Sequence, residues 1–224
     1  SNGDGITVTS DSYNNKIFHN NFINNTRHVY TDMNSTWDKS YPYGGNYWSN
    51  YTGVDFYSGL LQNEAGSDGI GDTPHAIDGN NTDNYPLMGP INTFDAGTWN
   101  ETACYIDIVS NSTILNFQLN IAEKTISFNV IGEMGFGFCR VIIPNVIVEE
   151  LWHYNYTVLL NGEPLPHVNW TDGTYTYIYF TYPHSMHKIE IIPEFPTWAS
   201  MLLILIVLTV AVAVYRRRLK TPIH

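Results

Sequence analysis

Residues 4–32 read DGITVTSDSYNNKIFHNNFINNTRHVYTD, a stretch in which short apolar beads alternate with Asn-rich corners. The beads include Ile6, Ile17, Phe22 and Val29, and the first and last of them are 23 residues apart. This spacing is typical of a parallel β-helix, in which each short strand stacks on the strand of the next coil and Asn side chains line up at the turns. Because a solenoid needs roughly three or more repeats to bury a continuous core, we interpret these coils as the last rungs of a right-handed parallel β-helix.

The first residues of the chain, SNGDG, contain neither a Met nor a signal peptide. A protein whose N-terminal part is exported normally carries such a signal. We therefore expect that Ser1 is not the native start and that earlier rungs precede it.

Three motifs, in order along the chain, resemble the C-terminal cap of NosD-type β-helix proteins. They are NKIFHNNFINNT, YPYGGNYWSNYTGVD and GSDGIGDTPHAIDGNNTDNYPLMGP, and together they cover about Asn15 to Pro90. This family is common on archaeal surfaces and is similar to carbohydrate-binding and sugar-hydrolase-like β-helices. The resemblance implies that residues 1–92 are β-helix rungs with capping loops. NosD itself is associated with copper delivery, whereas the archaeal surface relatives share the rungs without an established copper role.

Residues 93–192 have the pattern of an all-β domain. KTISFNVIG and TYTYIYFTY alternate with period two, as strands with one wet face do, and NGEP and TDG supply turns between strands. Seven or eight short strands in about 100 residues predict an immunoglobulin-like β-sandwich. The expected strands are 104–109, 113–121, 125–131, 138–143, 146–151, 156–160, 174–181 and 187–192.

The C-terminal segment predicts a membrane anchor. Residues 197–215 read TWASMLLILIVLTVAVAVY, nineteen residues without charge, and a helix of this length spans about 28 Å, close to the ~30 Å hydrocarbon core. Basic residues follow at once in RRRLK, so the positive-inside rule places the tail in the cytoplasm. We expect a Pro-containing linker at 193–197, a transmembrane helix at 198–215 and a basic cytoplasmic tail at 216–224.

The same segment resembles a sorting signal. PEFPTW, the hydrophobic span and RRR are similar to the PEF-type C-terminal signal of archaea, which implies an archaeosortase that removes the helix and attaches a lipid. A retained transmembrane helix is the alternative. In either case the chain is expected at the cell membrane, with everything before Pro193 extracellular.

The charge distribution limits the partners. The part before the anchor holds all 21 Asp and Glu but only six of the ten Lys and Arg, a net charge of −15. This balance argues against a nucleic-acid partner, because phosphate binding needs Lys and Arg. Eight Asn-x-Ser/Thr sequons favour a glycosylated surface protein, although Asn-rich turns also produce sequons by chance. The sequons begin at Asn24, Asn34, Asn50, Asn80, Asn100, Asn111, Asn155 and Asn169.

Cys104 and Cys139 are the two cysteines of the chain. In an oxidising compartment they are expected to form a disulfide, which would stabilise the domain by on the order of 3–4 kcal/mol in the chain-entropy model. Two unpaired buried thiols are the alternative.

Carboxylates make calcium the candidate cofactor. Between Lys39 and Lys124 the chain has 84 residues without Lys or Arg but with ten carboxylates, and calcium binds six to eight oxygens from loops rich in Asp, Asn and carbonyl groups. The alternative is that these Asp and Gly residues form solvated turns. The candidate ligands are Asp68, Asp72, Asp78, Asn80 and Asp83.

Other chemistry has weaker signals. The aromatic residues Tyr43, Tyr47 and Trp48 are candidates for a sugar-binding platform, and the alternative is that they cap the apolar end of the coil. Glycoside hydrolysis needs two facing carboxyl groups, and β-helix enzymes place theirs along the solenoid face, most of which we expect to be missing. For copper, no Cys/His cluster or Met-rich segment supports a site.

These observations predict a non-enzymatic, membrane-anchored surface protein that displays a β-helix for adhesion or glycan binding. Its partners would be the membrane, a surface polysaccharide or other cell-surface proteins. A surface polysaccharide lyase or hydrolase, with its active site on missing rungs, is the first alternative. Copper or other metal handling of the NosD type is the second.

Overall fold

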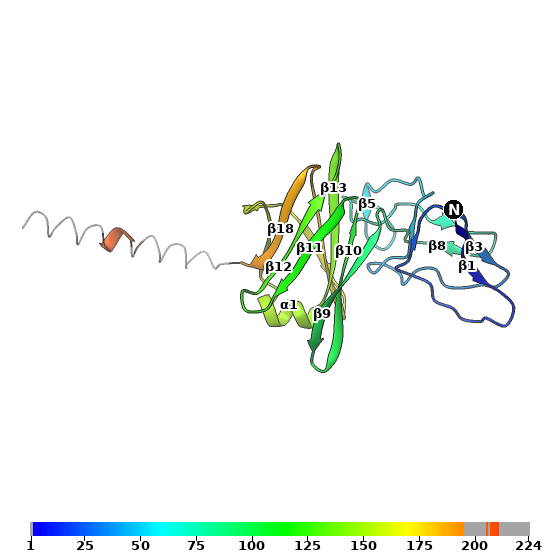
Figure 1. The fold of residues 1–224 in the computed structure, drawn as a ribbon, viewed down its shortest axis with the longest axis horizontal. Coiled ribbons are helices and arrows are strands. Elements are labelled where there is room, and N and C mark those ends of the chain that lie inside the picture. Colours follow the sequence, from blue (N-terminus) through cyan, green and yellow to red (C-terminus); the bar gives the residue numbers. More distant parts are fainter. Residues whose placement is uncertain (1, 195–204, 206, 211–224) are drawn as a thin grey trace, which may run out of the picture.

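The computed structural model describes residues 2–194, 205 and 207–210, and within the first of these ranges it is built almost entirely of β-strands. Figure 1 shows two parts side by side, an N-terminal unit (residues 2–90, blue to cyan) and a sandwich (residues 91–193, green to orange). The elements are β1 (Asn2–Val8), β2 (Asn21–Phe22), β3 (Asn25–Thr31), β4 (Tyr47–Trp48), β5 (Tyr57–Ser58), β6 (Glu64–Ala65), β7 (His75–Ala76), β8 (Thr82–Asp83), β9 (Ile91–Trp99), β10 (Thr102–Ser110), β11 (Thr113–Asn120), β12 (Thr125–Ile131), β13 (Phe136–Pro144), α1 (Asn145–Trp152), β14 (Tyr156–Leu160), β15 (Glu163–Pro164), β16 (Val168–Thr171), β17 (Tyr175–Pro183) and β18 (Met186–Pro193).

The N-terminal unit is held together by parallel pairing between successive passes of the chain. β1 pairs with β3 so that Ile6 lies opposite Val29, which is the 23-residue offset expected from the spacing of the apolar beads. β2 pairs in parallel with β4, so that Phe22 lies opposite Trp48. Tyr47 in turn makes a parallel bridge to Leu87. Segments far apart in the sequence therefore lie in neighbouring layers.

A small aromatic core fills the space between these layers. Val8, Ile17, Phe22, Trp37 and Trp48 are buried together. The rings of Phe22 and Trp48 stack with their centroids 4.2 Å apart, an offset contact between aligned strands.

Asn46 supplies the polar link in the same place. Its side-chain amide donates to the carbonyl oxygens of Ile17 (2.8 Å) and Trp37 (2.7 Å), and its oxygen accepts from the backbone N–H of Asn20 (3.1 Å). The Asn46 side chain is fully buried, so these bonds satisfy groups that water cannot reach.

The sandwich has two five-stranded sheets, ordered β16-β17-β13-β10-β9 and β11-β12-β18-β14-β15. Alternate residues of both sheets point inward and form one large core, to which α1 adds Ile147, Val148, Leu151 and Trp152. In immunoglobulin constant domains the first, second, fourth and fifth strands share a sheet. Here β12, the fourth strand of the sandwich, lies in the other sheet from β9, β10 and β13.

Seven of the eight strands expected in this region are present, and one is a helix. The prediction of a strand at 146–151 is wrong, because residues 145–152 form α1. The β-branched run Val146–Val148 suggested a strand, but the apolar positions 147, 148, 151 and 152 follow the helical period and leave Glu149 and Glu150 exposed. The strands β9, β15 and β16 were not expected.

The predicted disulfide is also wrong: Cys104 and Cys139 are both free and buried. They lie on the paired strands β10 and β13, but the residue opposite Cys139 is Ser110. Cys104 precedes Ser110 by six residues on β10, so at about 3.4 Å per residue the Cα atoms of Cys104 and Cys139 are roughly 20 Å apart. A disulfide needs Cα atoms within about 7 Å of each other.

The predicted anchor at 198–215 and tail at 216–224 fall outside the described residues, except for Leu205 and residues 207–210, which are helical. Among the residues that are described, none belongs to a helix with the length and apolar character needed to span a membrane.

Candidate functional site

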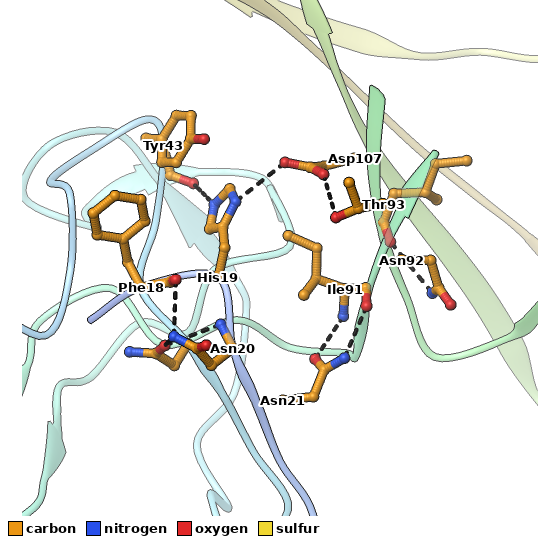
Figure 2. Close-up of polar contacts among 11 residues, drawn as sticks. Phe18, His19, Asn20, Asn21, Tyr43, Ile91, Asn92, Thr93 and Asp107 are labelled. Atoms are coloured by element: carbon orange, nitrogen blue, oxygen red, sulfur yellow. Dashed lines mark hydrogen bonds and ion pairs between the residues drawn. The ribbon is translucent and has the colours of Figure 1, made fainter. Parts of the chain in front are cut away.

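The N-terminal unit meets the sandwich through a polar junction centred on His19 and Asp107 (Figure 2). His19 Nδ1 lies 3.2 Å from Asp107 Oδ2, and Nε2 lies 3.0 Å from the carbonyl oxygen of Tyr43. The other carboxylate oxygen of Asp107 accepts a 2.6 Å bond from the Thr93 hydroxyl. The side chains of His19 and Asp107 are each at most 15 % exposed, so solvent screens this contact less than a contact on the surface.

Below this pair, Asn21 fixes the junction with two bonds to one backbone position. Its amide donates to the carbonyl oxygen of Ile91 and its oxygen accepts from the N–H of Ile91, both at 2.8 Å (Figure 2). The start of β9 is thereby held against β2, in the N-terminal unit.

A second anchor point is Arg140, on the outer face of β13. Its guanidinium donates to the backbone carbonyl oxygens of Asp68 and Pro42, and it is fully buried. The ring centroid of Tyr177 lies 5.0 Å from the guanidinium carbon. The N-terminal unit thus covers part of the outer face of the β13 sheet and leaves the rest open.

The uncovered part of this face forms a cleft of about 620 Å³, which we call the junction cleft. This volume is within the ~300–1,000 Å³ typical of small-molecule sites. The lining comes from four places: the N-terminal unit, the β9–β10 hairpin, the start of α1 and the turn before β17. The lining residues are His19, Tyr43, Thr93, Trp99, Asn100, Thr102, Ala103, Cys104, Tyr105, Asp107, Pro144, Asn145, Val146, Gly173, Thr174 and Tyr175.

Aromatic rings make up part of the lining of the junction cleft. Tyr43 stacks on the His19 ring at 4.2 Å, and Tyr175 packs against Tyr43 at 5.1 Å. The Lys39 ammonium lies 3.9 Å from the centroid of Tyr43. Burial, together with the neighbouring Tyr175, raises the pKa of the Tyr43 hydroxyl, so this group stays a neutral hydrogen-bond donor. Tyr105, another lining residue, is 53 % exposed.

The cleft is rich in polar groups but holds few charges. Of the described residues that line it, Asp107 alone has a carboxyl group, and that group is already bonded to His19 and Thr93. Hydroxyl and amide groups come from Thr93, Thr102, Asn145 and Thr174. The site is therefore suited to a neutral, hydroxyl-rich ligand.

The five calcium candidates do not converge. Asp72 accepts from the N–H groups of Phe56 and Tyr57, and Asp78 accepts from those of Asn80 and Asn81. The exposed Asn80 lies in the same turn as Asp78. Each carboxylate thus closes its own loop, as Asp does in ordinary turns.

The two buried candidates, Asp68 and Asp83, have separate surroundings. Asp83 accepts from the Trp48 indole (2.9 Å) and from the N–H of Asn46 (2.7 Å), whereas Asp68 accepts from the N–H of Ile70 (2.9 Å). Burial raises the pKa of both carboxyl groups, that of Asp83 to about 7. Across the described residues, no three His, Cys, Asp or Glu side chains are grouped so as to hold a metal ion.

The proposed sugar platform is divided. Tyr43 lines the junction cleft, but Trp48 is buried in the core of the N-terminal unit and Tyr47 is half-buried between layers. His28 and His75 both pack against Trp48 and line a separate cavity of about 570 Å³. His184 and His187, which the sequence places three residues apart, bond to the carbonyl oxygens of Met134 and Pro183 respectively.

All eight sequon asparagines are exposed, although other asparagines such as Asn46 and Asn81 are buried. Two of the eight line cavities: Asn100 lines the junction cleft, and Asn50 lines the cavity beside His28.

The sequence reasoning missed most of the cleft. Trp99, Tyr105 and Tyr175 lie on strands whose pairing was unknown, and the contact of His19 with Asp107 joins residues 88 positions apart. The one available signal was the pattern CYIDIV, in which Tyr105 and Asp107 occupy the face of the strand opposite to the apolar residues.

Comparison with known proteins gives one family match. The family described as periplasmic copper-binding protein (NosD) matches residues 1–53, about a quarter of the chain, which include β1 to β4 and the cleft residues His19 and Tyr43. Neither the curated proteins nor the solved structures include a match to the chain.

Proposed function

We propose that this protein binds glycans at the cell surface through the junction cleft, without acting as an enzyme. The observation that carries the proposal is the composition of the cleft, where the exposed ring of Tyr105 and the half-buried rings of Trp99 and Tyr175 stand beside hydroxyl and amide groups in a cavity of about 620 Å³. A site of this kind holds its ligand with apolar walls and a few placed polar groups.

The chemistry of a sugar matches these walls. A pyranose has an apolar face of C–H groups and a rim of hydroxyls, so it packs against aromatic rings while its edge makes hydrogen bonds. In the junction cleft Tyr105 and Tyr175 offer the rings, and the hydroxyl groups of Thr102 and Thr174 offer the polar edge. The Asn145 amide is already bonded to Asp172 and Thr176. The absence of an unpaired charge among the described lining residues favours a neutral glycan over an anionic one.

The junction cleft has fewer carboxyl groups than a glycosidase needs, which favours binding of a glycan over its hydrolysis. Glycosidases use two, on opposite sides of the scissile bond and roughly 5 to 9.5 Å apart. Among the described residues of this cleft only Asp107 has one, and its oxygens are engaged by His19 and Thr93.

The remaining parts serve display. In our proposal the N-terminal unit is the end of a right-handed parallel β-helix, supported by the parallel pairs β1–β3 and β2–β4. The sandwich is a stalk that holds it above the membrane, and the uncharged segment at 198–215 is the anchor.

The test is a screen of the full chain, in detergent, against an array of neutral and acidic oligosaccharides. We expect binding of neutral oligosaccharides, weakened about tenfold or more by Tyr105→Ala, which removes an exposed ring and so leaves the core intact. Tyr30→Ala is the matched control, because Tyr30 is 41 % exposed on β3 and lies outside the cleft lining. Equal loss in both variants, or no binding by the wild-type chain, would reject the proposal.

A further inference from the structure

Asn100 is both a sequon asparagine and a residue of the junction cleft. The sequon Asn100-Glu101-Thr102 forms the tip of the β9–β10 hairpin, where Trp99 pairs with Thr102. Both Asn100 (φ +48°) and Glu101 (φ +63°) are left-handed, as the two central residues of a type I′ turn are. The tight turn holds Asn100 in the lining of the cleft, to which Trp99, Thr102 and Tyr105 of the same hairpin also contribute.

The Asn100 amide is available for modification. The side chain is exposed, and within the described residues none of its atoms takes part in a hydrogen bond, since Thr102 bonds to the backbone carbonyl oxygen instead. Asn111 differs, because its amide donates to the carbonyl oxygen of Phe136 and its oxygen accepts from the N–H of Phe138.

We propose that an N-linked glycan on Asn100 folds back into the junction cleft and occupies it as an intramolecular ligand. The proposal rests on the proposed glycan-binding function. In the modification, Asn100 Nδ2 bonds to the anomeric carbon of the first sugar and releases one proton to solvent. The donor is a lipid-linked oligosaccharide phosphate, whose bond from that carbon to the phosphate oxygen breaks, and the lipid phosphate leaves with the electron pair.

Attachment makes weak recognition sufficient. A ligand tethered by a short linker has an effective concentration in the millimolar range, so a sugar with a millimolar dissociation constant occupies the cleft for much of the time. A free glycan must then displace the attached one. The glycan on Asn100 would thus regulate the site, which opens only to a ligand of higher affinity or on chains that lack the modification.

The experiment compares full chains made in a host that N-glycosylates exported proteins with chains made in a host that does not. Glycopeptide mass spectrometry measures occupancy at Asn100 and Asn34. Digestion of the folded protein with exoglycosidases matched to the host glycan then measures protection. We expect the Asn100 glycan to be trimmed about tenfold more slowly than the glycan on Asn34, which is exposed and outside the cleft lining.

Variants separate this effect from loss of folding. Thr102→Ala removes the sequon without changing Asn100, whereas Thr102→Ser retains it. Because Thr102 itself lines the cleft, its direct effect on binding is measured first, by comparing Thr102→Ala with wild type in the unglycosylated protein. Relative to that effect, Thr102→Ala in the glycosylated protein should strengthen the binding of a free oligosaccharide by about tenfold, and Thr102→Ser should not.

An unoccupied Asn100, or equal trimming at Asn100 and Asn34, would overturn the proposal even if the unglycosylated chain binds oligosaccharides. Protection at Asn100 in a protein that binds no free oligosaccharide would instead uphold the intramolecular ligand and reject the wider function. The two failures are therefore distinguishable.

Discussion

Arg140 joins the two parts of the molecule through a single side chain. Its guanidinium is fully buried, donates to two backbone carbonyl oxygens of the N-terminal unit and lies near the carboxyl groups of Asp68 and Asp55. A buried cation with such partners contributes little net stability, but removal leaves its partners uncompensated.

Arg140→Met should therefore lower the free energy of unfolding by about 3–5 kcal/mol, measured by urea denaturation. The carbonyl oxygens of Pro42 and Asp68 would lose their donors, and no other described cation stands close to Asp68. Lys188→Met is the control: Lys188 pairs with Glu190 on the surface, and its loss should cost at most about 1 kcal/mol. Similar losses in the two variants would contradict the assigned role.

Asp55 makes stability depend on pH. Burial, and to a lesser degree Asp68 and Asp72, raise its pKa to about 7, although the N–H groups of Asp68 and Gly69 act in the opposite direction. The folded pKa lies above the unfolded value, so the contribution to stability is full below about pH 4 and is lost as pH rises through 7.

Between pH 5 and pH 8 this group alone should lower the free energy of unfolding by about 2–3 kcal/mol. Asp83, whose pKa is also about 7, acts in the same direction. Asp55→Asn mimics the protonated form, so its unfolding free energy should fall less steeply over that range. Urea denaturation at pH 5, 6.5 and 8 provides the measurement, and parallel profiles for the two proteins would exclude Asp55 as a source.

The layers of the N-terminal unit depend on Asn46. It bonds to Asn20, Ile17 and Trp37, and its backbone N–H donates to Asp83, so it connects four segments. Asn46→Ala leaves two buried carbonyl groups and a backbone N–H without partners.

We expect this change to lower the unfolding free energy by about 2–4 kcal/mol. Asn84→Ala is the matched control, because Asn84 is exposed and its amide makes one bond, to Asp38. Its effect should be about 1 kcal/mol or less. If thermal melting ranks the two variants equally, Asn46 does not hold the layers together.

Elements were predictable where one pattern dominated. The strands at 125–131 and 156–160 have the predicted bounds, because alternation and flanking turns agree there. α1 was predicted as a strand because its β-branched residues favour a strand, whereas the spacing of its apolar residues favours a helix. Burial of the apolar side of α1 against the sandwich core stabilises the helix. The 23-residue offset of β1 and β3 could be read from the bead spacing alone.

At the scale of the whole molecule, the site could not be predicted because it has no local signature. The junction cleft exists only where the N-terminal unit ends on the outer face of the β13 sheet, and its parts come from residues 19 to 175. Of the residues singled out from the sequence, Tyr43, Asn100 and Cys104 lie in it. The carboxylates that suggested calcium instead bond to N–H groups in separate loops.

Because the candidate carboxylates lie in separate loops, we predict how the melting temperature of the whole chain responds to metal ions. Because the oxygens of Asp72, Asp78 and Asp83 already accept hydrogen bonds, we expect the same melting temperature in calcium, magnesium and EDTA. A calcium-specific rise that is lost in Asp68→Asn/Asp72→Asn or in Asp78→Asn/Asp83→Asn would instead identify a calcium-binding loop.

The position of Arg140 has a consequence for the order of events during synthesis. The carbonyl oxygen of Pro42 accepts its hydrogen bond from Arg140, which is 98 residues further along the chain. The carbonyl oxygen of Asp68 accepts from the same side chain, 72 residues further along. Chains emerge from the ribosome N-terminal part first, at about 5–20 residues per second. The first layers of the N-terminal unit can thus form early. The loops that contain Pro42 and Asp68 lack these two hydrogen bonds for several seconds, until β13 has emerged and Arg140 packs against them. A chain truncated before β13 should therefore be a substrate for quality-control proteases, however well its layers stack.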